Sequence, residues 1–141
     1  MNIQKNPIER LTQFGIKPSL QRIAVMNYLL KNYNHPTVDM IFNKLYASIP
    51  TLSKTTVYNT LKLLAQQGVI MEITIDEKNV RYDGDISQHA HFQCKNCGCI
   101  RDIPIKNIKT ISDNEAGELL ITESRLYYKG YCEKCKANLV K

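Results

Sequence analysis

Two Cys-x-x-Cys pairs constrain the fold of this chain more than any other feature of its sequence. They are Cys94 with Cys97 and Cys132 with Cys135, both in the second half of the 141 residues. Each pair presents two thiols from one tight turn, and two such turns complete the tetrahedral four-thiolate site typical of structural zinc. One pair alone would leave a redox dithiol open, whereas two pairs in one short domain favour a metal. We therefore predict a structural Zn²⁺ that ties the C-terminal strand to the strands around residues 94–99.

The length and hydropathy of the chain limit its class. A chain of 141 residues buries one modest core or two small ones. The sequence has no apolar run of about 18 residues and no basic-then-apolar N-terminal signal, so we expect a soluble cytoplasmic protein without a membrane partner. In such a protein, the five cysteines fit a metal site better than a disulfide framework. The fifth, Cys99, belongs to neither pair, and we expect it to be a small buried apolar side chain.

The formal charge of +6 is concentrated in the first half. Only Glu9 and Asp39 oppose the basic residues up to Met71, and the rest of the chain is balanced. These basic residues are Lys5, Arg10, Lys17, Arg22, Lys31, Lys44, Lys54 and Lys62. A basic half joined to a neutral half is typical of a phosphate-binding module with a separate second task. A solvated, lysine-rich surface would give the same count.

Apolar periodicity predicts helices in the first half. Ser19 is expected to cap a helix running to about Asn32, and Ser53 another that ends near Gly68. Between them, a helix after residues 36–37 carries an apolar stripe at helical spacing: Val38, Ile41, Phe42 and Leu45. The β-rich runs 69–75 and 79–82 follow and indicate a hairpin. Helices followed by a hairpin are the order of a winged helix-turn-helix.

The second half reads as strands with one helix. Residues 89–94 and 99–103 are expected to be strands on either side of the first cysteine pair. Pro104 is expected to begin a helix carrying Ile105, Ile108 and Ile111. A strand from about residue 119 to 131 then leads into the second cysteine pair. The two halves together predict an α+β protein.

Histidine is scarce, and its placement is informative. The three histidines are His35, His89 and His91. In a strand, alternate residues share a face, so His89 and His91 point the same way while Cys94 falls on the opposite face. Imidazoles and thiolates are therefore expected in separate sites. Three carboxylates are close in the sequence: Asp83, Asp85 and Asp102. A mixture of His and Asp suits Fe(II), Mn(II) or Zn(II), although ordinary surface histidines remain the alternative.

The helix that begins after Ser53 has small and polar residues at its N-terminal end. Methyl and ring groups of Thr56 and Tyr58 can contact thymine methyl groups, and the amide of Asn59 can pair with adenine. This pattern is typical of a recognition helix in the major groove of DNA. A polar face that is merely solvated gives the same pattern.

Seven sequence strings, taken in order, identify a resemblance. They are Gly15-Ile16-Lys17, Gln21-Arg22, His35-Pro36-Thr37, SKTTVYNTL at 53–61, Arg81-Tyr82-Asp83, HAHFQCKNCG at 89–98 and CEKC at 132–135. Their order and spacing resemble the ferric uptake regulator (Fur) superfamily over nearly the whole chain, most closely its peroxide-sensing (PerR) branch. The resemblance implies a winged helix-turn-helix DNA-binding domain at 1–83, a hinge at 84–88, and an α/β dimerisation domain at 89–141 with the four-cysteine zinc.

The resemblance also implies a function and the residues that perform it. The chain would be a homodimeric repressor of transcription on double-stranded operator DNA, and not an enzyme. The regulatory Fe(II) or Mn(II) site would consist of His35, Asp83, His89, His91 and Asp102. Contacts with DNA would come from Lys17, Arg22, Lys54, Thr56, Tyr58 and Asn59. Peroxide reacting at Fe(II) would oxidise His35 or His89, open the hinge and release the DNA, whereas Mn(II) would support repression without that reaction.

Departures from the family pattern bear on the choice of branch. Fur-type sequences commonly carry a further histidine where this chain has Ser87-Gln88, and no histidines remain for a second regulatory site. Asn59 fits the peroxide-sensing branch, since iron-sensing relatives often have a basic residue there. The main alternative is a Fur-type repressor that responds to the level of iron or manganese. A small non-haem iron enzyme is a further alternative, but it leaves the basic helical half unexplained.

Overall fold

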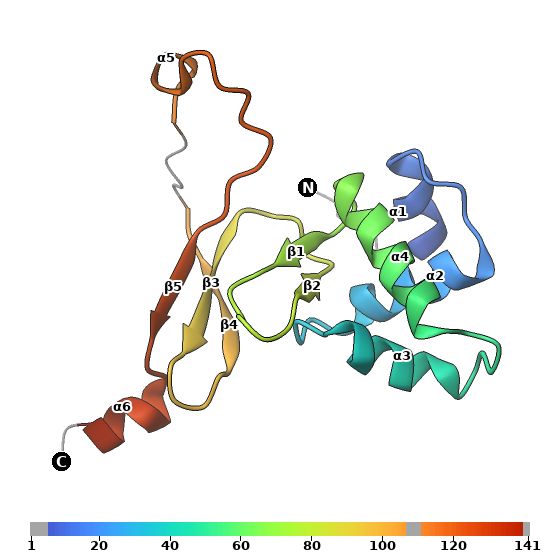
Figure 1. Ribbon diagram of the computed structural model, residues 1–141, viewed down its shortest axis with the longest axis horizontal. Helices are drawn as coiled ribbons and strands as arrows, with labels where there is room; N and C mark the ends of the chain where they lie inside the picture. Colours follow the sequence, from blue (N-terminus) through green and yellow to red (C-terminus); the bar gives the residue numbers. More distant parts are fainter. Residues whose placement is uncertain (1–5, 107–110, 140–141) are drawn as a thin grey trace. The chain divides into compact units, whose positions relative to one another are not determined.

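The computed structural model describes residues 6–106 and 111–139 (Figure 1). The chain divides into two compact units, with the boundary between Ile86 and Ser87. Among the described residues, no helix has both the length and the apolar character needed to cross a membrane.

The first unit contains four helices and a hairpin (Figure 1). Its elements are α1 (Pro7–Gln13), α2 (Leu20–Lys31), α3 (Val38–Tyr46), α4 (Lys54–Gln66), β1 (Met71–Ile73) and β2 (Arg81–Asp83). Each helix begins at a side chain that accepts backbone N–H groups of the first turn, namely Asn6, Ser19, Thr37 and Ser53. The caps expected at Ser19 and Ser53 are therefore confirmed. Helix α1 was not predicted, because its seven residues are too few to show a periodic apolar stripe.

Helix α4 buries one of its faces in the core of the first unit and exposes the other. Its side chains Val57, Leu61 and Leu64 are fully buried and recur at the spacing of one helix face. Burying a side chain of this size contributes about 1.5–3 kcal/mol. The opposite side of the helix leaves Tyr58 and Asn59 exposed. The core thus fixes the orientation of α4 and determines which face it presents to solvent.

The hairpin of the first unit is antiparallel, with Met71 opposite Asp83 and Ile73 opposite Arg81. Both strands are shorter than the β-rich runs that predicted them, since only three residues of each are paired. Helices α2 to α4 followed by this hairpin form a winged helix-turn-helix, as predicted.

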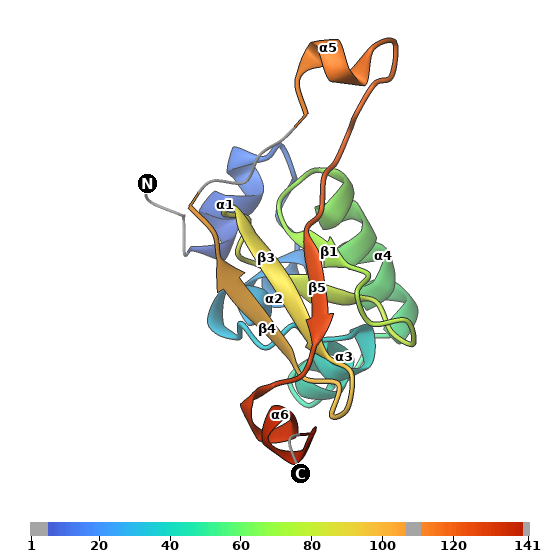
Figure 2. The ribbon, with the colours of Figure 1, turned by 90° about the vertical axis from the view of Figure 1, so that its left-hand side faces the viewer.

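The second unit is built on a three-stranded sheet of order β4-β3-β5 (Figure 2). The strands are β3 (His89–Cys94), β4 (Ile100–Pro104) and β5 (Tyr127–Gly130), joined by the short helix α5 (Asp113–Ala116) and followed by α6 (Glu133–Leu139). Strand β3 pairs antiparallel with β4 and parallel with β5. The α+β class is confirmed.

Two local predictions in this unit are wrong, and one helix was not predicted. Pro104 ends β4 and does not begin a helix, because β4 is an edge strand of its sheet, where a residue without an N–H is tolerated. Ile105 lies outside any helix or strand, Ile108 lies outside the described residues, and the helix comes later, capped by Ser112. The strand expected from residue 119 is limited to 127–130, where β3 supplies a partner. Helix α6 was not predicted.

Candidate functional site

A cluster of thiols lies where the sheet of the second unit meets α6. The Sγ atoms of Cys94, Cys97, Cys99 and Cys132 all lie within 4.8 Å of one another. The Sγ atoms of Cys97 and Cys132 are 3.8 Å apart. Zinc–sulfur bonds of about 2.3 Å in a tetrahedron place neighbouring sulfurs about 3.8 Å apart. The donors and their spacing therefore fit a tetrahedral thiolate-bound metal.

The backbone brings these thiols together through one tight turn and one strand pairing. Gly98 has a φ of 78°, and its N–H donates to the carbonyl of Cys94 over 3.0 Å. A left-handed φ is readily adopted only by glycine, so Gly98 closes this turn without strain. The N–H of Lys95 donates to the carbonyl of Gly130 over 2.7 Å, which places the end of β5, and Cys132 after it, beside the turn.

Backbone donors favour the ionised form of the Cys94 thiol. The N–H of Cys132 donates to its Sγ over 3.4 Å. Together with the N–H groups of Cys97 and Asn96, this contact lowers the pKa of Cys94 to about 5. Burial raises the pKa of the Cys99 thiol to about 11. Because thiolates are the ligands of zinc, the N–H groups around Cys94 predispose that side chain to bind a metal.

The two remaining cysteines lie beside this centre in different ways. Cys99 is half-buried and packs against the apolar cluster around Cys94, in part as expected, and its Sγ also lies within the group of close thiols. Cys135, a predicted ligand, is outside that group of four but is buried against Cys94 and Cys132, and its Sγ accepts a hydrogen bond from Nδ2 of Asn96 over 3.2 Å. The structure therefore offers five thiols at a centre for which two Cys-x-x-Cys pairs predicted four.

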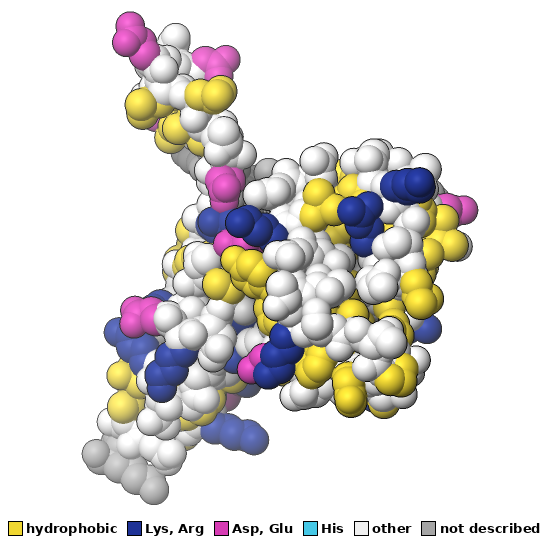
Figure 3. Space-filling model, turned by 45° about the vertical axis from the view of Figure 1, so that its right-hand side comes forward, with side chains coloured by type: hydrophobic (Ala, Val, Ile, Leu, Met, Phe, Trp, Pro, Cys, Tyr) yellow, Lys and Arg dark blue, Asp and Glu magenta, His cyan; other side chains and the backbone are white. Residues whose placement is uncertain are grey.

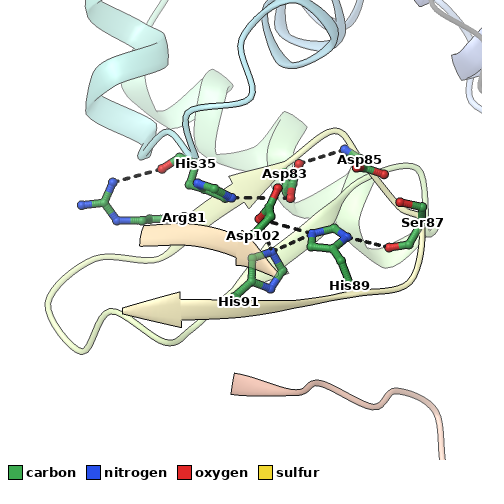
Figure 4. Close-up of polar contacts among 8 residues, drawn as sticks. All are labelled: His35, Arg81, Asp83, Asp85, Ser87, His89, His91 and Asp102. Atoms are coloured by element: carbon green, nitrogen blue, oxygen red, sulfur yellow. Dashed lines mark hydrogen bonds and ion pairs between the residues drawn. The ribbon is translucent and has the colours of Figure 1, made fainter. Parts of the chain in front are cut away.

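A second group of ligand-type atoms lies on strands β3 and β4. Nε2 of His89 and Nε2 of His91 are each 3.4 Å from Oδ1 of Asp102, and the two nitrogens are 3.0 Å apart (Figure 4). Bonds of about 2.1 Å to one ion place neighbouring ligand atoms about 3.0 Å apart at right angles and about 3.4 Å apart at the tetrahedral angle. The predicted common face of His89 and His91 is confirmed, and their spacing with Asp102 fits a divalent metal.

The protonation of His89 is set by its backbone neighbour. Its Nδ1 lies 2.8 Å from the carbonyl oxygen of Ser87 (Figure 4). A carbonyl only accepts hydrogen bonds, so in the neutral ring Nδ1 carries the proton and Nε2 keeps its lone pair. That lone pair faces Asp102 and His91. Metal-binding histidines are commonly held in this way, with the other ring nitrogen donating to a carbonyl.

The first unit holds a separate pair, His35 and Asp83. Nε2 of His35 lies 3.8 Å from Oδ2 of Asp83 (Figure 4). The carbonyl of His35 accepts a hydrogen bond from Nη1 of Arg81 over 3.0 Å, and the next carbonyl, of Pro36, accepts one from the N–H of Tyr82 over 3.0 Å. These bonds hold the loop against β2 while His35 adopts a φ of 52°. A left-handed φ costs a residue other than glycine about 1–3 kcal/mol, and such strain is frequent at functional sites.

Hydrogen bonds and close packing hold the backbone at Gly84, near the end of the first unit. Nη2 of Arg10 donates to the carbonyls of Val69 and Gly84 over 2.9 Å and 2.7 Å. A Cβ on Gly84 would lie 2.8 Å from the carbonyl oxygen of Leu29, so only glycine fits there. The N–H of Asp85 then donates to Oδ1 of Asp83 over 2.9 Å. Sequence reasoning missed Arg10, which counted as a surface charge, because nothing in the sequence distinguishes a buried arginine from an exposed one.

The predicted nucleic-acid residues lie on or near α4 in the first unit. Arg22, Thr56 and Asn59 contribute to one groove of about 260 Å³. Nη1 of Arg22 donates to the carbonyl of Lys17 over 2.9 Å, so these two residues are adjacent. The side chain of Lys54 is 57% exposed, with Nζ 3.2 Å from Oδ1 of Asp39, and Tyr58 is 48% exposed. Six candidate residues are thus reachable from solvent or from this groove: Lys17, Arg22, Lys54, Thr56, Tyr58 and Asn59.

The segment around α5 exposes apolar side chains that the sequence analysis did not single out as a surface. Leu119 and Leu120 are 71% and 88% exposed, and together with Ile111 and Ile121 they border a hollow of about 540 Å³. Figure 3 shows hydrophobic side chains gathered on this segment. Contiguous exposed apolar surface is typical of a protein–protein interface.

A winged helix-turn-helix joined to a small sheet that carries thiols and imidazoles at ligand spacing defines a metal-binding protein of the DNA-binding winged-helix class. Residues 13–128 match the Ferric uptake regulator family. The chain belongs to this family.

Curated relatives and solved structures agree with that assignment. The chain is 31% identical over 134 residues to the peroxide operon regulator of Bacillus subtilis, a match that covers 93% of this chain and 92% of the relative. It is 30% identical over 131 residues to the peroxide-responsive repressor PerR of Staphylococcus epidermidis, covering 92% of this chain and 87% of that protein.

Solved structures are similar in fold, and two of them come from named relatives. The ferric uptake regulator of Francisella tularensis with iron superposes with a TM-score of 0.68 at 26% identity, covering 87% of this chain and 96% of that one. PerR of Streptococcus pyogenes was solved as a structural basis for peroxide sensing and gene regulation. It superposes with a TM-score of 0.51 at 28% identity, covering 91% of this chain and 89% of that one.

Proposed function

We propose that this protein is a cytoplasmic, metal-dependent repressor of transcription that releases its operator DNA in response to peroxide. The observation that carries the proposal is the constellation of His89, His91 and Asp102, whose ligand atoms lie 3.0–3.4 Å apart. The names of the relatives from Bacillus and Staphylococcus support a response to peroxide. A regulator also accounts for the basic first unit, which an enzyme using the same histidines would not need.

The thiol cluster is proposed to hold a structural Zn²⁺. The distance of 3.8 Å between the Sγ atoms of Cys97 and Cys132 fits two ligands of a tetrahedral zinc ion. The predicted ligands are Cys94, Cys97, Cys132 and Cys135. Four protein ligands fill the coordination sphere, so this metal supplies stability and not chemistry. In a unit with so small a core, a metal that binds only the folded form stabilises it directly.

We propose that His35 and Asp83 join His89, His91 and Asp102 around one Fe(II) or Mn(II). Each unit separately holds a His–Asp arrangement, His35 with Asp83 in the first and the pair on β3 with Asp102 in the second. An ion bound by residues of both units favours one orientation of the hinge through its greater affinity for that state. In a homodimer, this orientation sets the spacing of two recognition helices.

Peroxide sensing is proposed to act on the histidines. Fe(II), when bound, supplies the electron that activates peroxide, whereas Mn(II) in the same ligand set does so far less readily. His35 and His89 are the ligands that we expect to gain an oxygen atom. An oxidised imidazole is a poor ligand, so its loss would weaken the link between the units and allow the DNA to dissociate.

On the DNA side, α4 is proposed to enter the major groove. The exposed Tyr58 and Asn59 would contact bases, while Lys17, Arg22 and Lys54 would contact phosphates or the minor groove. The apolar segment around α5 is proposed to contact a second copy of the chain, since a homodimer would cover it.

One experiment separates the proposal from its main alternative. The protein is loaded with Fe(II) or Mn(II), bound to an operator selected from random DNA, and treated with mild peroxide. The Fe(II) form is expected to leave the DNA with oxygen added to His35 or His89 by mass spectrometry, and with zinc retained. The Mn(II) form is expected to stay bound. Intact histidines and persistent DNA binding in the Fe(II) form would instead indicate a repressor that responds to the metal level.

A further inference from the structure

The thiol centre of the second unit has five cysteines for four coordination positions. We propose that Cys99 can occupy the fourth position, so that the centre retains Zn²⁺ when Cys135 is removed. The inference rests on the zinc centre proposed above. Three thiols are common to both ligand sets, namely Cys94, Cys97 and Cys132.

The spacing of the sulfur atoms supports Cys99 as a ligand. Its Sγ belongs to the group of mutually close thiols that contains all three common ligands. Every pair in this group lies within 4.8 Å, a distance that short side-chain rotations reduce to the tetrahedral value of about 3.8 Å. Cys135 instead receives a hydrogen bond from the amide of Asn96, which gives its sulfur a partner without a metal.

The backbone holds Cys99 in place independently of Cys135. The carbonyl of Cys99 accepts a hydrogen bond from the N–H of Cys94 over 3.0 Å, which closes the turn between β3 and β4. Cys99 is therefore supplied by a paired hairpin. Cys135 is supplied by the seven-residue helix α6, near the C-terminal end of the described chain. One fourth ligand can replace the other without moving the three ligands that they share.

The exchange balances in charge. Zn²⁺ has no preferred geometry from its d electrons, so one thiolate serves as well as another. The Cys99 thiol loses a proton as its bond to zinc forms, and the Cys135 thiolate takes up a proton as its bond breaks. The metal keeps four thiolates throughout, and no oxidant or reductant is needed.

Three variants test the exchange: Cys135→Ser, Cys99→Ser and the double variant. We expect each single variant to retain one zinc per chain by elemental analysis, because four thiols remain. The double variant is the reference for loss, because it leaves only three thiols and should lose zinc. With Co²⁺ in place of zinc, Cys135→Ser should keep the full sulfur-to-cobalt charge-transfer band, whereas a three-thiolate site would lose about a quarter of it.

Failure of the inference is distinct from failure of the zinc centre. Loss of zinc in Cys135→Ser to the level of the double variant, with zinc intact in the unaltered protein, would overturn only the inference. Absence of zinc from the unaltered protein would remove both. If Cys135→Ser does not fold, brief alkylation of the unaltered, zinc-loaded protein asks the same question. Label on Cys135 in a fraction of the molecules that retain zinc supports exchange, and label confined to Cys99 overturns it.

Discussion

His91 and Asp102 face each other across the ladder between β3 and β4, with Nε2 of the histidine 3.4 Å from Oδ1 of the aspartate. Their register therefore fixes this contact, and His89, two residues along the same face of β3, reaches the same carboxylate oxygen. Three ligand atoms are held at metal spacing by the strands themselves. A divalent metal bound here would therefore meet three ligand atoms that the strands already hold in place.

The carboxylate of Asp102 should dominate the affinity for divalent metal, because it brings charge and touches both imidazoles. Asp102→Ala is expected to weaken Mn(II) binding by about 100-fold, measured by titration calorimetry and by the Mn(II) needed to retain operator DNA. Asp113→Ala, at the exposed start of α5, is the matched control and should change neither. An unchanged Mn(II) titration in Asp102→Ala would place the metal elsewhere.

Removal of Cys94 should dismantle the thiol centre. Cys94 is 1% exposed and accepts the N–H of Cys132, so its sulfur connects β3 with the start of α6. Cys94→Ser is expected to lose one zinc per chain and to lower the thermal midpoint, as read by elemental analysis and circular dichroism. Chelation of zinc from the unaltered protein should reproduce the same loss. Full zinc content in a variant that lacks both Cys94 and Cys99 would contradict a metal at this cluster.

The exposed face of α4 should decide which DNA is bound. Asn59→Ala is expected to cost about 1–3 kcal/mol of binding to the selected operator, because one base-specific contact is lost. Lys17→Ala should weaken binding to all sequences alike and reduce the slope of affinity against salt by about one. Both variants should keep their zinc and their oligomeric state. Operator binding that is unaffected in both would show that α4 is not the recognition helix.

Arg10 should stabilise the first unit far more than a surface arginine stabilises the second. Arg10 is 1% exposed and donates to two carbonyls, and Arg10→Ala would leave both without this donor. We expect a loss of about 2 kcal/mol or more in urea unfolding. Arg101→Ala, which removes an exposed ion pair with Glu133, is the control and should leave the urea midpoint nearly unchanged, because solvent screens that pair. Equal effects would contradict a structural role for Arg10.

The apolar segment around α5 should control association. Leu120→Glu places a charge on a side chain that is 88% exposed, so a monomer can accommodate it and an apolar interface cannot. We expect sedimentation to show a shift from dimer to monomer. Leu20→Glu, at a 67% exposed leucine of α2, serves as the control and should leave the dimer intact. A dimer that persists in Leu120→Glu would place the interface on another surface.

Local chemistry made part of this fold predictable. Ser19 and Ser53 cap helices because their side chains accept N–H groups of the first turn, a local role that the sequence predicts. The alternation of side chains along a strand likewise predicts that His89 and His91 share a face, where they lie close together. The prediction that Pro104 begins a helix was wrong, because a proline is also tolerated in an edge strand. Which strand lies at the edge of the sheet is a property of the tertiary structure.

The features that the sequence did not reveal depend on contacts between distant residues. The sequence from residue 119 on predicts one strand, yet within the described residues β3 pairs with β5 only from Tyr127. The closeness of Cys99 to the other thiols comes from the turn at Gly98, and the burial of Arg10 comes from carbonyls 59 and 74 residues away. No periodic pattern encodes such contacts.

The contacts around Gly84 leave only a short connection between the two units. Leu29 and Arg10 hold the chain at Gly84, the N–H of Asp85 is held by Asp83, and the carbonyl of Ser87 is engaged by His89. Fixing the backbone of one residue costs about 1–2 kcal/mol of conformational entropy, so ordering so short a connection costs little. In the proposed function, a single metal–ligand bond would outweigh that cost, and the loss of one ligand would be enough to release the connection.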